Sequence, residues 1–175
     1  MQMELHHGLP MRDLVAGLAA GLLLLVAASL ATTLRAYRRR RQQARDSERA
    51  LGRTIVAELP IADELVLVSE DEHRFYYGER AIDKDRIAAV RVLINGSPIA
   101  AYESRRHAAD VAPQATRFED RPDGIARDRW DVAVETVAGT VLIECGAIRE
   151  RVSQELARAI FDAVKDDVER RDRDI

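Results

Sequence analysis

The sequence predicts an α+β chain, in which an apolar N-terminal helix precedes an antiparallel β-sandwich of about seven strands and a C-terminal amphipathic helix. Three observations predict this class. Residues 14–34 carry no charged side chain, short segments between residues 54 and 145 are rich in β-branched and aromatic residues, and apolar residues after residue 147 recur at every fourth position. The first pattern is typical of a membrane-spanning helix, and the other two are typical of a small globular domain.

The uncharged segment from Leu14 to Leu34 has the length of a transmembrane helix. Its 21 residues would form a helix about 31 Å long, and the hydrocarbon core of a bilayer is about 30 Å thick. A cleaved signal peptide is the alternative, but its apolar run is shorter, about 7 to 15 residues, and follows the basic residues instead of preceding them. We therefore expect residues 1–13 to form a short extracytoplasmic tail and residues 14–34 to span the membrane once.

Basic residues gather directly after the predicted span. Residues 35–53 hold eight arginines against Asp46 and Glu48, a net charge of +6. The positive-inside rule then places the N-terminus outside and the C-terminal residues in the cytoplasm, at the inner membrane of a cell. The same residues would attract anionic lipids. We expect a helical stalk over 35–53 with a membrane-surface cluster formed by Arg35, Arg38, Arg39, Arg40, Arg41 and Arg45.

Small residues lie on one face of the predicted span. Gly17 and Gly21 are four positions apart, a spacing that lets two helix backbones approach closely. Two interpretations stay open: this face pairs with a second copy of the helix to form a homodimer, or it faces only lipid.

The domain expected over residues 54–175 is acidic. It holds 18 basic and 26 acidic residues, a net charge of −8, whereas a nucleic-acid-binding protein needs a basic face to replace phosphate counterions. The composition therefore excludes nucleic acid as the expected partner.

Cys145 is the only cysteine, so no disulfide can form within the chain. Since Cys145 shares an apolar face with Val141 and Ile143, we expect it to be a buried hydrophobic residue and not a reactive thiol.

The expected strands are separated by turn-forming residues. Asn95 and Gly96 predict a two-residue hairpin. In the strand that begins at Trp130, this residue, Val132 and Val134 are expected on one face, with Asp131 on the other. The strands are expected at residues 54–59, 65–69, 73–77, 86–94 and 98–103, from residue 130, and at 140–145.

Two further segments complete the predicted domain. Residues 104–129 are polar and too many for an ordinary loop, which predicts either a mobile segment or a loop that binds a partner. The residues expected to contact that partner are Arg105, Arg106, His107, Asp110 and Arg117. From Ala147 to about Arg170, one helix with one buried stripe is expected, and its charged end is expected to fray into solvent. The stripe consists of Ile148, Val152, Leu156, Ile160, Val164 and Val168.

The sequence carries no pattern that names a reaction, a metal or a cofactor. His107 with Asp110 or Glu103 would be an acid–base pair, but no nucleophile in a strained turn accompanies it. The pair His6 and His7 has only one nearby carboxylate, whereas a metal site needs at least three convergent ligands. We therefore expect a protein without catalytic residues or cofactors.

Two stretches of this sequence resemble bacterial membrane-anchored proteins with a pleckstrin-homology-like domain. They are residues 75–90, which begin Phe-Tyr-Tyr-Gly, and residues 130–139, which begin Trp-Asp-Val-Ala-Val-Glu-Thr. The resemblance implies two packed sheets closed at one end by the C-terminal helix, over about residues 54–172. Another small α+β sandwich is the alternative fold. Members that bind phosphoinositides have a basic loop between the first two strands, but Leu59–Glu64 contains two acidic residues and no basic one.

What remains of the resemblance is the commonest use of such domains, a rigid platform for protein contacts. We therefore expect a non-catalytic docking or assembly platform for a membrane protein complex. One alternative is a module that binds a small apolar or lipid-derived ligand at the membrane, which requires a pocket of a few hundred cubic ångströms. A second alternative is an enzyme that uses His107 and nearby carboxylates.

Overall fold

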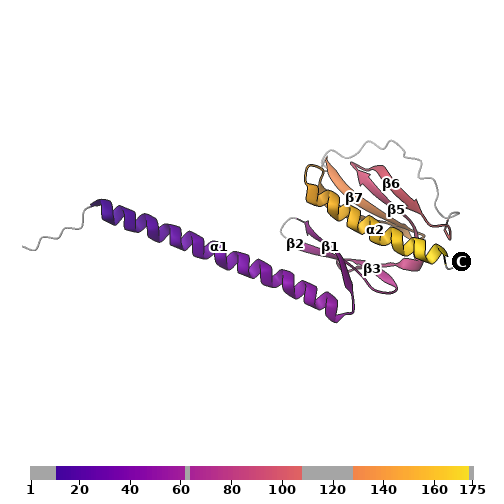
Figure 1. Ribbon diagram of the computed structural model, residues 1–175, viewed down its shortest axis with the longest axis horizontal. Coiled ribbons are helices and arrows are strands. Elements are labelled where there is room, and N and C mark those ends of the chain that lie inside the picture. Colours follow the sequence, from indigo (N-terminus) through magenta and orange to yellow (C-terminus); the bar gives the residue numbers. More distant parts are fainter. Residues whose placement is uncertain (1–10, 62–63, 108–127, 174–175) are drawn as a thin grey trace, which may run out of the picture. The chain divides into compact units, whose positions relative to one another are not determined.

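The computed structural model describes residues 11–61, 64–107 and 128–173, and the chain divides into two compact units, Met1–Ala44 and Arg45–Ile175. The first described element, α1 (Met11–Ala50), is one unbroken helix (Figure 1). It is long and apolar enough to cross a membrane. Its large apolar side chains from Val15 to Leu34 are 51% to 72% exposed. This exposure distinguishes α1 from the core helix of a soluble protein, whose apolar side chains are buried.

The described part of the second unit contains eight strands in two antiparallel sheets, one more strand than predicted. The strand β4 was not predicted because it is four residues long and only Ile82 in it is buried, so it has no alternating pattern. The first sheet has the order β1 (Thr54–Ile61), β2 (Glu64–Glu70), β3 (Arg74–Tyr77), β4 (Arg80–Asp83). The second has the order β6 (Ser97–Glu103), β5 (Ile87–Ile94), β7 (Arg129–Thr136), β8 (Gly139–Ala147).

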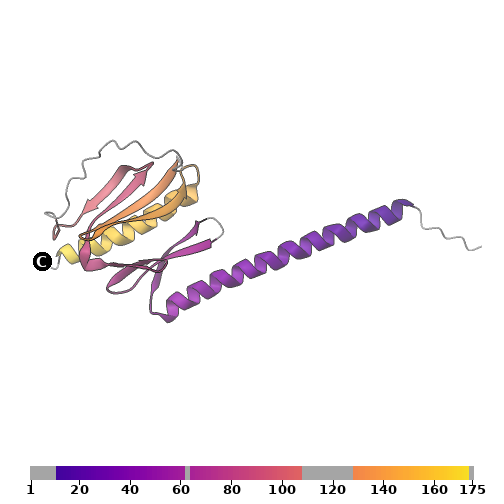
Figure 2. The same ribbon diagram turned by 180° about the vertical axis from the view of Figure 1, so that it is seen from behind.

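The helix α2 (Arg151–Arg173) follows β8 and covers one face of the second sheet (Figures 1 and 2). It packs against β5, β7 and β8 of that sheet and against β1 of the first, and the two sheets adjoin through β1 and β8. Apolar side chains of both sheets and of α2 form one core between these elements. A short 3-10 helix, η1 (Lys84–Arg86), links β4 to β5 at the C-terminal end of α2.

Two local predictions are confirmed. Asn95 and Gly96 have positive φ angles of 52° and 78°, and Ile94 pairs with Ser97, so the turn is the predicted two-residue hairpin. Trp130, Val132 and Val134 all belong to the core.

The helix α2 differs from its prediction in its limits and in its buried face. It begins at Arg151, not at Ala147, and Val152 is 59% exposed, while the neighbouring Ser153 is buried. The predicted stripe repeats at every fourth residue, which rotates about 40° per step around a helix, so it cannot remain on one face. The buried residues instead alternate spacings of four and three over Ser153, Ala157, Ile160, Val164 and Asp167, and Val168 lies next to the last of them.

Candidate functional site

A polar cleft of about 520 Å³ lies between β2, η1 and the C-terminal end of α2. It was not predicted, because the charged residues near the end of α2 were expected to fray. They are ordered in the helix to Arg173, and two of them, Arg170 and Arg171, line the cleft. Its lining is Gly52, Thr54, Glu70, Asp71, Glu72, Lys84, Asp167, Arg170 and Arg171.

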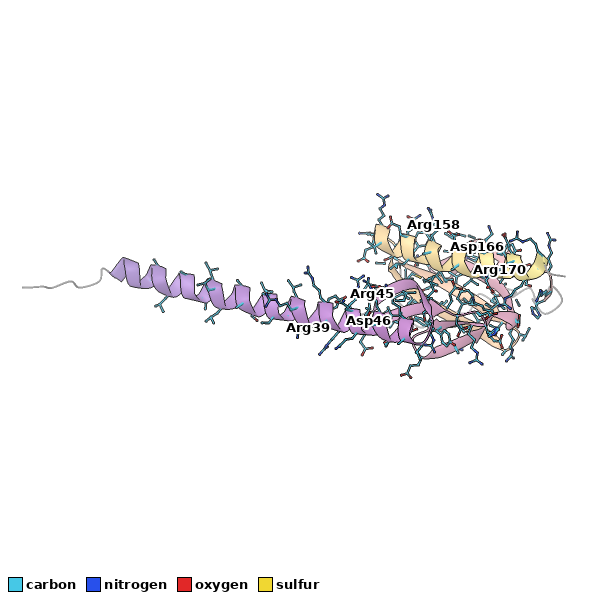
Figure 3. All side chains as sticks on the ribbon, turned by 60° about the horizontal axis from the view of Figure 1, so that its bottom comes forward. Arg39, Arg45, Asp46, Arg158, Asp166 and Arg170 are labelled. Carbon is cyan, nitrogen blue, oxygen red and sulfur yellow. The ribbon has the colours of Figure 1, made fainter. Side chains whose placement is uncertain are left out.

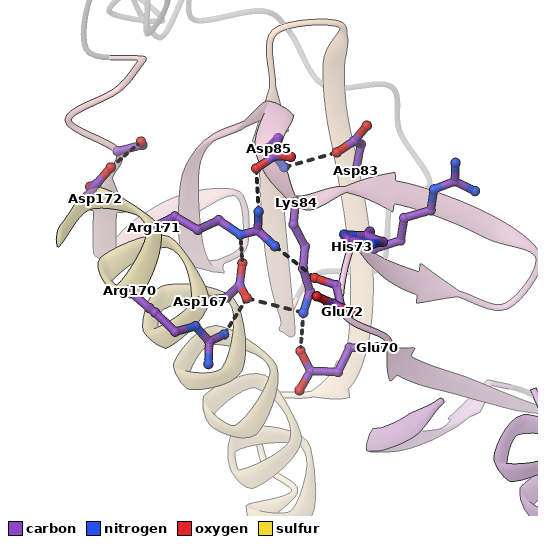
Figure 4. A network of polar contacts seen from close by, with 12 residues as sticks. Glu70, Glu72, His73, Asp83, Lys84, Asp85, Asp167, Arg170, Arg171 and Asp172 are labelled. Carbon is purple, nitrogen blue, oxygen red and sulfur yellow. Dashed lines mark hydrogen bonds and ion pairs between the residues drawn. The ribbon is translucent and has the colours of Figure 1, made fainter. Parts of the chain in front are cut away.

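The centre of this cleft is a buried ion pair between Lys84 and Asp167, whose side chains are 3% and 2% exposed (Figure 4). Lys84 Nζ lies 3.3 Å from Asp167 Oδ1 and 2.7 Å from Glu70 Oε2, and it donates to the carbonyl oxygen of Asp71 at 2.8 Å. Two of the three N–H donors of this ammonium group therefore form hydrogen bonds within the protein, and Asp167 is its ion-pair partner.

Two arginines of α2 bind the other side of Asp167. Arg170 Nη2 donates to Oδ1 at 2.5 Å, and Arg171 Nε donates to Oδ2 at 2.7 Å. Arg171 also donates to Asp85 Oδ1 and, at 3.0 Å, to the carbonyl oxygen of Glu72 (Figure 4). Burial alone would raise the pKa of Asp167, but the hydrogen bonds from Arg171 and Arg170 outweigh it and lower that pKa. We call Lys84, Asp85, Asp167, Arg170 and Arg171 the clasp.

The turn after β2 is held by Asp71. Its carboxylate accepts hydrogen bonds from the hydroxyl of Tyr76 at 2.7 Å and from the backbone N–H groups of His73 and Arg74 at 2.8 and 2.7 Å. The Tyr76 hydrogen bond is the main reason that the pKa of Asp71 falls to about 2. The Arg53 guanidinium lies 3.6 Å from the centre of the Tyr76 ring. This turn is therefore rigidly attached to its neighbours.

The clasp joins the C-terminal end of α2 to η1 through ion pairs and hydrogen bonds within the protein. Its side chains bind one another, and the described residues contain no group of three or more histidine, cysteine or acidic residues able to hold a metal. Catalysis by a lysine or carboxylate requires a donor or acceptor that is directed at the substrate. Here the donors of Lys84 point at protein acceptors, so the cleft is a structural junction between α2, β2 and η1.

An apolar groove of about 400 Å³ lies at the other end of α2, between this helix and the strands β5 and β6. The strand β6 is at an edge of its sheet among the described strands. The side chain of Ile99 in this strand is 55% exposed at the groove, and Phe161 of α2 is half-buried. The lining is Val92, Ile99, Ala100, Trp130, Gln154, Ala157, Arg158, Phe161 and Asp162. Most of this surface is apolar, so it suits an apolar side chain or ligand.

Trp130 was expected in the core, and the structure places it in the core beside this groove. It is 9% exposed, and its indole Nε1–H donates to the carbonyl oxygen of Ile148 at 3.4 Å. Since its only polar atom has a partner, Trp130 presents an apolar ring to the groove.

The predicted partner loop is described at its two ends only. The backbone N–H of Arg105 donates to Asp172 Oδ2 at 2.9 Å, Arg106 donates to the carbonyl oxygen of Arg171, and His107 Nε2 lies 2.9 Å from the carbonyl oxygen of Asp85. The loop therefore leaves β6 attached to the clasp. Asp110 and Arg117 lie outside the described residues.

The hypothetical acid–base pair of His107 gains no support from this geometry. The ring nitrogen Nε2 faces a backbone carbonyl, and the carboxylate of Glu103 accepts a hydrogen bond from Arg91 at 2.8 Å. Neither group is brought to the polar cleft or to the apolar groove.

The structure divides the predicted basic cluster. Arg45 donates to Glu58 Oε1 of β1, and the compact unit begins at this residue, before the predicted domain start at Thr54. Arg35, Arg38, Arg39, Arg40 and Arg41 belong to the first unit and are exposed. Arg45 is therefore part of the globular unit, whereas the other five are not.

Gly17 and Gly21 have open space around them, since a Cβ atom at either position would meet nothing within 4 Å. Their role in helix pairing stays a prediction. Cys145 is buried at 4% exposure, as expected, and burial raises the pKa of its thiol to about 12.

No protein-family model matches this chain, and neither a curated protein nor a solved structure has significant similarity to it. The resemblance to pleckstrin-homology-like domains therefore stays a prediction, while the α+β class and the two antiparallel sheets are observed.

Sequence reasoning did not find the clasp or the groove. Lys84 and Asp167 are 83 positions apart and occur in polar surroundings, where charged residues are ordinarily exposed. A period of 3.6 residues, instead of the strict spacing of four, would have placed Asp167 on the buried face of α2. This is the one sequence pattern that could have indicated the clasp. Nothing in the local pattern of Ile99 indicates that it lies beside a groove.

Proposed function

We propose that this chain is a single-pass inner-membrane protein, with its N-terminus outside and its α+β domain in the cytoplasm, and that the domain is a non-catalytic docking platform for a membrane protein complex. The observation that supports docking most directly is the apolar groove beside Ile99 on the edge strand β6. Monomeric soluble surfaces rarely leave apolar grooves next to an edge strand uncovered, because both features invite association.

The membrane assignment is supported by the exposed apolar surface of α1 between Val15 and Leu34. An exposed helix of this length has no way to hide its apolar side chains from water except in lipid or against another protein. An anchored platform confines its partner near the membrane, which raises the effective concentration of the partner without any new contact.

The docking test uses two exposed apolar strand residues. Ile99 borders the groove, whereas Leu142 of β8 is 42% exposed but does not line it. Tagged full-length protein carrying Ile99→Glu or Leu142→Glu would be cross-linked in native membranes and purified in mild detergent, and copurifying membrane proteins would be quantified by mass spectrometry. We expect Ile99→Glu to lower recovery of the partner about tenfold, a typical effect of losing an interface anchor. Leu142→Glu should leave recovery unchanged. Equal recovery with both variants would contradict docking at the groove.

The second candidate function is binding of a small apolar or lipid-derived ligand, because the groove volume of about 400 Å³ is in the range of ligand sites. Trp130 is the only tryptophan and lines the groove, so its fluorescence reports occupancy. Saturable quenching of Trp130 by a fatty acid, lost in Ile99→Glu and kept in Leu142→Glu, would favour this function over docking.

A further inference from the structure

The arginines near the end of α1 fall into two groups that the sequence does not separate. In the first group, each arginine has a carboxylate partner: Arg45 binds Glu58, Arg49 Nη1 lies 4.0 Å from Asp46 Oδ1, and Arg53 Nη1 lies 3.3 Å from Glu48 Oε2. In the second group, Arg35, Arg38, Arg39 and Arg40 form no ion pair with any of the described carboxylates. Figure 3 shows one member of each group, Arg39 and Arg45, on α1.

The second group extends around more than half of the helix. Because α1 is unbroken from Met11 to Ala50, each residue is rotated about 100° from the one before it. Relative to Arg35, the positions 38, 39 and 40 then lie at about 300°, 40° and 140°, so the four arginines cover about 200° of the circumference. A helix that lies flat on a membrane gathers its basic residues on one face. A spread wider than one face fits a helix that passes through the headgroup layer.

The second group begins directly after the apolar surface. Leu34 is an exposed large aliphatic side chain, Arg35 is next to it, and Tyr37 is the one exposed large apolar side chain between Arg35 and Arg40. The guanidinium groups would therefore lie at the depth of the lipid phosphates, which arginine binds through two parallel hydrogen bonds.

We propose that Arg35, Arg38, Arg39 and Arg40 form a collar that binds anionic phospholipid headgroups around α1. This proposal rests on the proposed membrane span. Charge complementarity between these arginines and anionic headgroups supports it. The surplus of positive charge lies in residues 35–53, because residues 54–175 hold 18 basic and 26 acidic residues. Arg45 was predicted in the same cluster, but its partner Glu58 neutralises it, so it lies outside the collar.

The test compares two double variants with the same charge change on the same helix. Full-length protein carrying Arg38→Gln/Arg39→Gln, or Arg45→Gln/Arg49→Gln, would be reconstituted in vesicles of equal parts phosphatidylcholine and phosphatidylglycerol. After mild detergent extraction, mass spectrometry would give the ratio of the two lipids that stay bound. One arginine near a membrane surface changes affinity about fivefold, so the first variant should lower the phosphatidylglycerol enrichment at least about fivefold. The second should match the wild type.

Equal enrichment in all three proteins would overturn the collar. Loss of double-stranded DNA binding in the first variant, with unchanged lipid enrichment, would also overturn it and identify a nucleic acid as the ligand. Carbonate extraction tests the span separately: if the wild-type chain is released from native membranes, the membrane span itself is wrong. If all three proteins stay in the membrane but only the first loses phosphatidylglycerol, both proposals are supported.

Discussion

The two ends of α2 meet the rest of the domain in opposite ways. At the C-terminal end, Asp167 and Arg171 belong to the clasp, where charged groups of α2 and η1 bind one another. At the N-terminal half, Ala157 and Phe161 line an apolar groove beside the edge strand β6. Arg158 and Arg170 mark these two regions in Figure 3.

The difference shows which end is available for binding. A charged group in a buried network already forms its hydrogen bonds with neighbouring groups. Removing one member of the network therefore leaves another buried charge without its partner. An exposed apolar side chain forms no such hydrogen bonds and can contact a partner protein. The clasp should therefore control stability and the groove should control binding, and three predictions test this division.

The largest expected effect is at the centre of the clasp. Asp167→Ala should destabilise the domain by about 3–5 kcal/mol, because it leaves Lys84 buried with one fewer carboxylate. Denaturant unfolding of the full chain in mild detergent, followed by Trp130 fluorescence, would measure it.

The control for this prediction is the double variant Lys84→Met/Asp167→Leu. It replaces both charges with apolar side chains of similar volume and should recover most of the lost stability. If Asp167→Ala alone cost less than about 1 kcal/mol, the range of exposed salt bridges, the clasp would not be a structural junction between α2 and η1.

A smaller effect is expected where β8 leads to the groove end of α2. Gly146 has a φ of 112°, and a Cβ atom there would lie 2.5 Å from Ser153 Oγ of α2. Gly146→Ala should therefore destabilise the domain by about 1–3 kcal/mol through strain and this clash. The matched control is Gly139→Ala in the same strand, which has a φ of 136° but meets nothing within 4 Å.

Thermal unfolding of both glycine variants would separate the two causes. Equal losses would attribute the effect to backbone strain alone and remove the contact with Ser153 from the explanation. A larger loss for Gly146→Ala would show that β8 and the start of α2 are closely packed at the groove.

The smallest and most local effect is expected in acid. The pKa of Asp71 is about 2 and that of Asp167 is also lowered, whereas the ordinary value is 3.8. Folding stability from these groups is thus present above the unfolded pKa, near pH 4, and is lost as the pH falls toward 2. Both carboxylates lie at the clasp end of the domain, so amide hydrogen exchange, corrected for its intrinsic pH dependence, should rise there before it rises at the groove.

Tyr76→Phe provides the control for the acid prediction. It removes the main cause of the low pKa of Asp71 and should weaken the acid dependence. An unchanged acid profile in this variant, or simultaneous loss of protection along the whole of α2, would contradict a separate titration of the clasp end.

The local elements were largely predictable, and the sites were not. The hairpin at Asn95 and Gly96 depends on two backbone conformations that these residues favour, so neighbouring residues were enough to identify it. The strand β4 escaped prediction because four residues with one buried side chain carry too little pattern. The buried face of α2 was misplaced because a strict spacing of four drifts around a helix.

The sequence alone determined the long apolar helix, the alternation that makes antiparallel strands, and the amphipathic helix at the end, because each depends on residues within a few positions of one another. The tertiary structure alone decided that Lys84 pairs with Asp167, that Arg45 of the predicted basic cluster pairs with Glu58, and that Ile99 borders a groove. These contacts join distant segments, and their partners are chosen by how the sheets and α2 pack. A charge in the sequence therefore does not reveal whether it will face water, lipid or another buried charge.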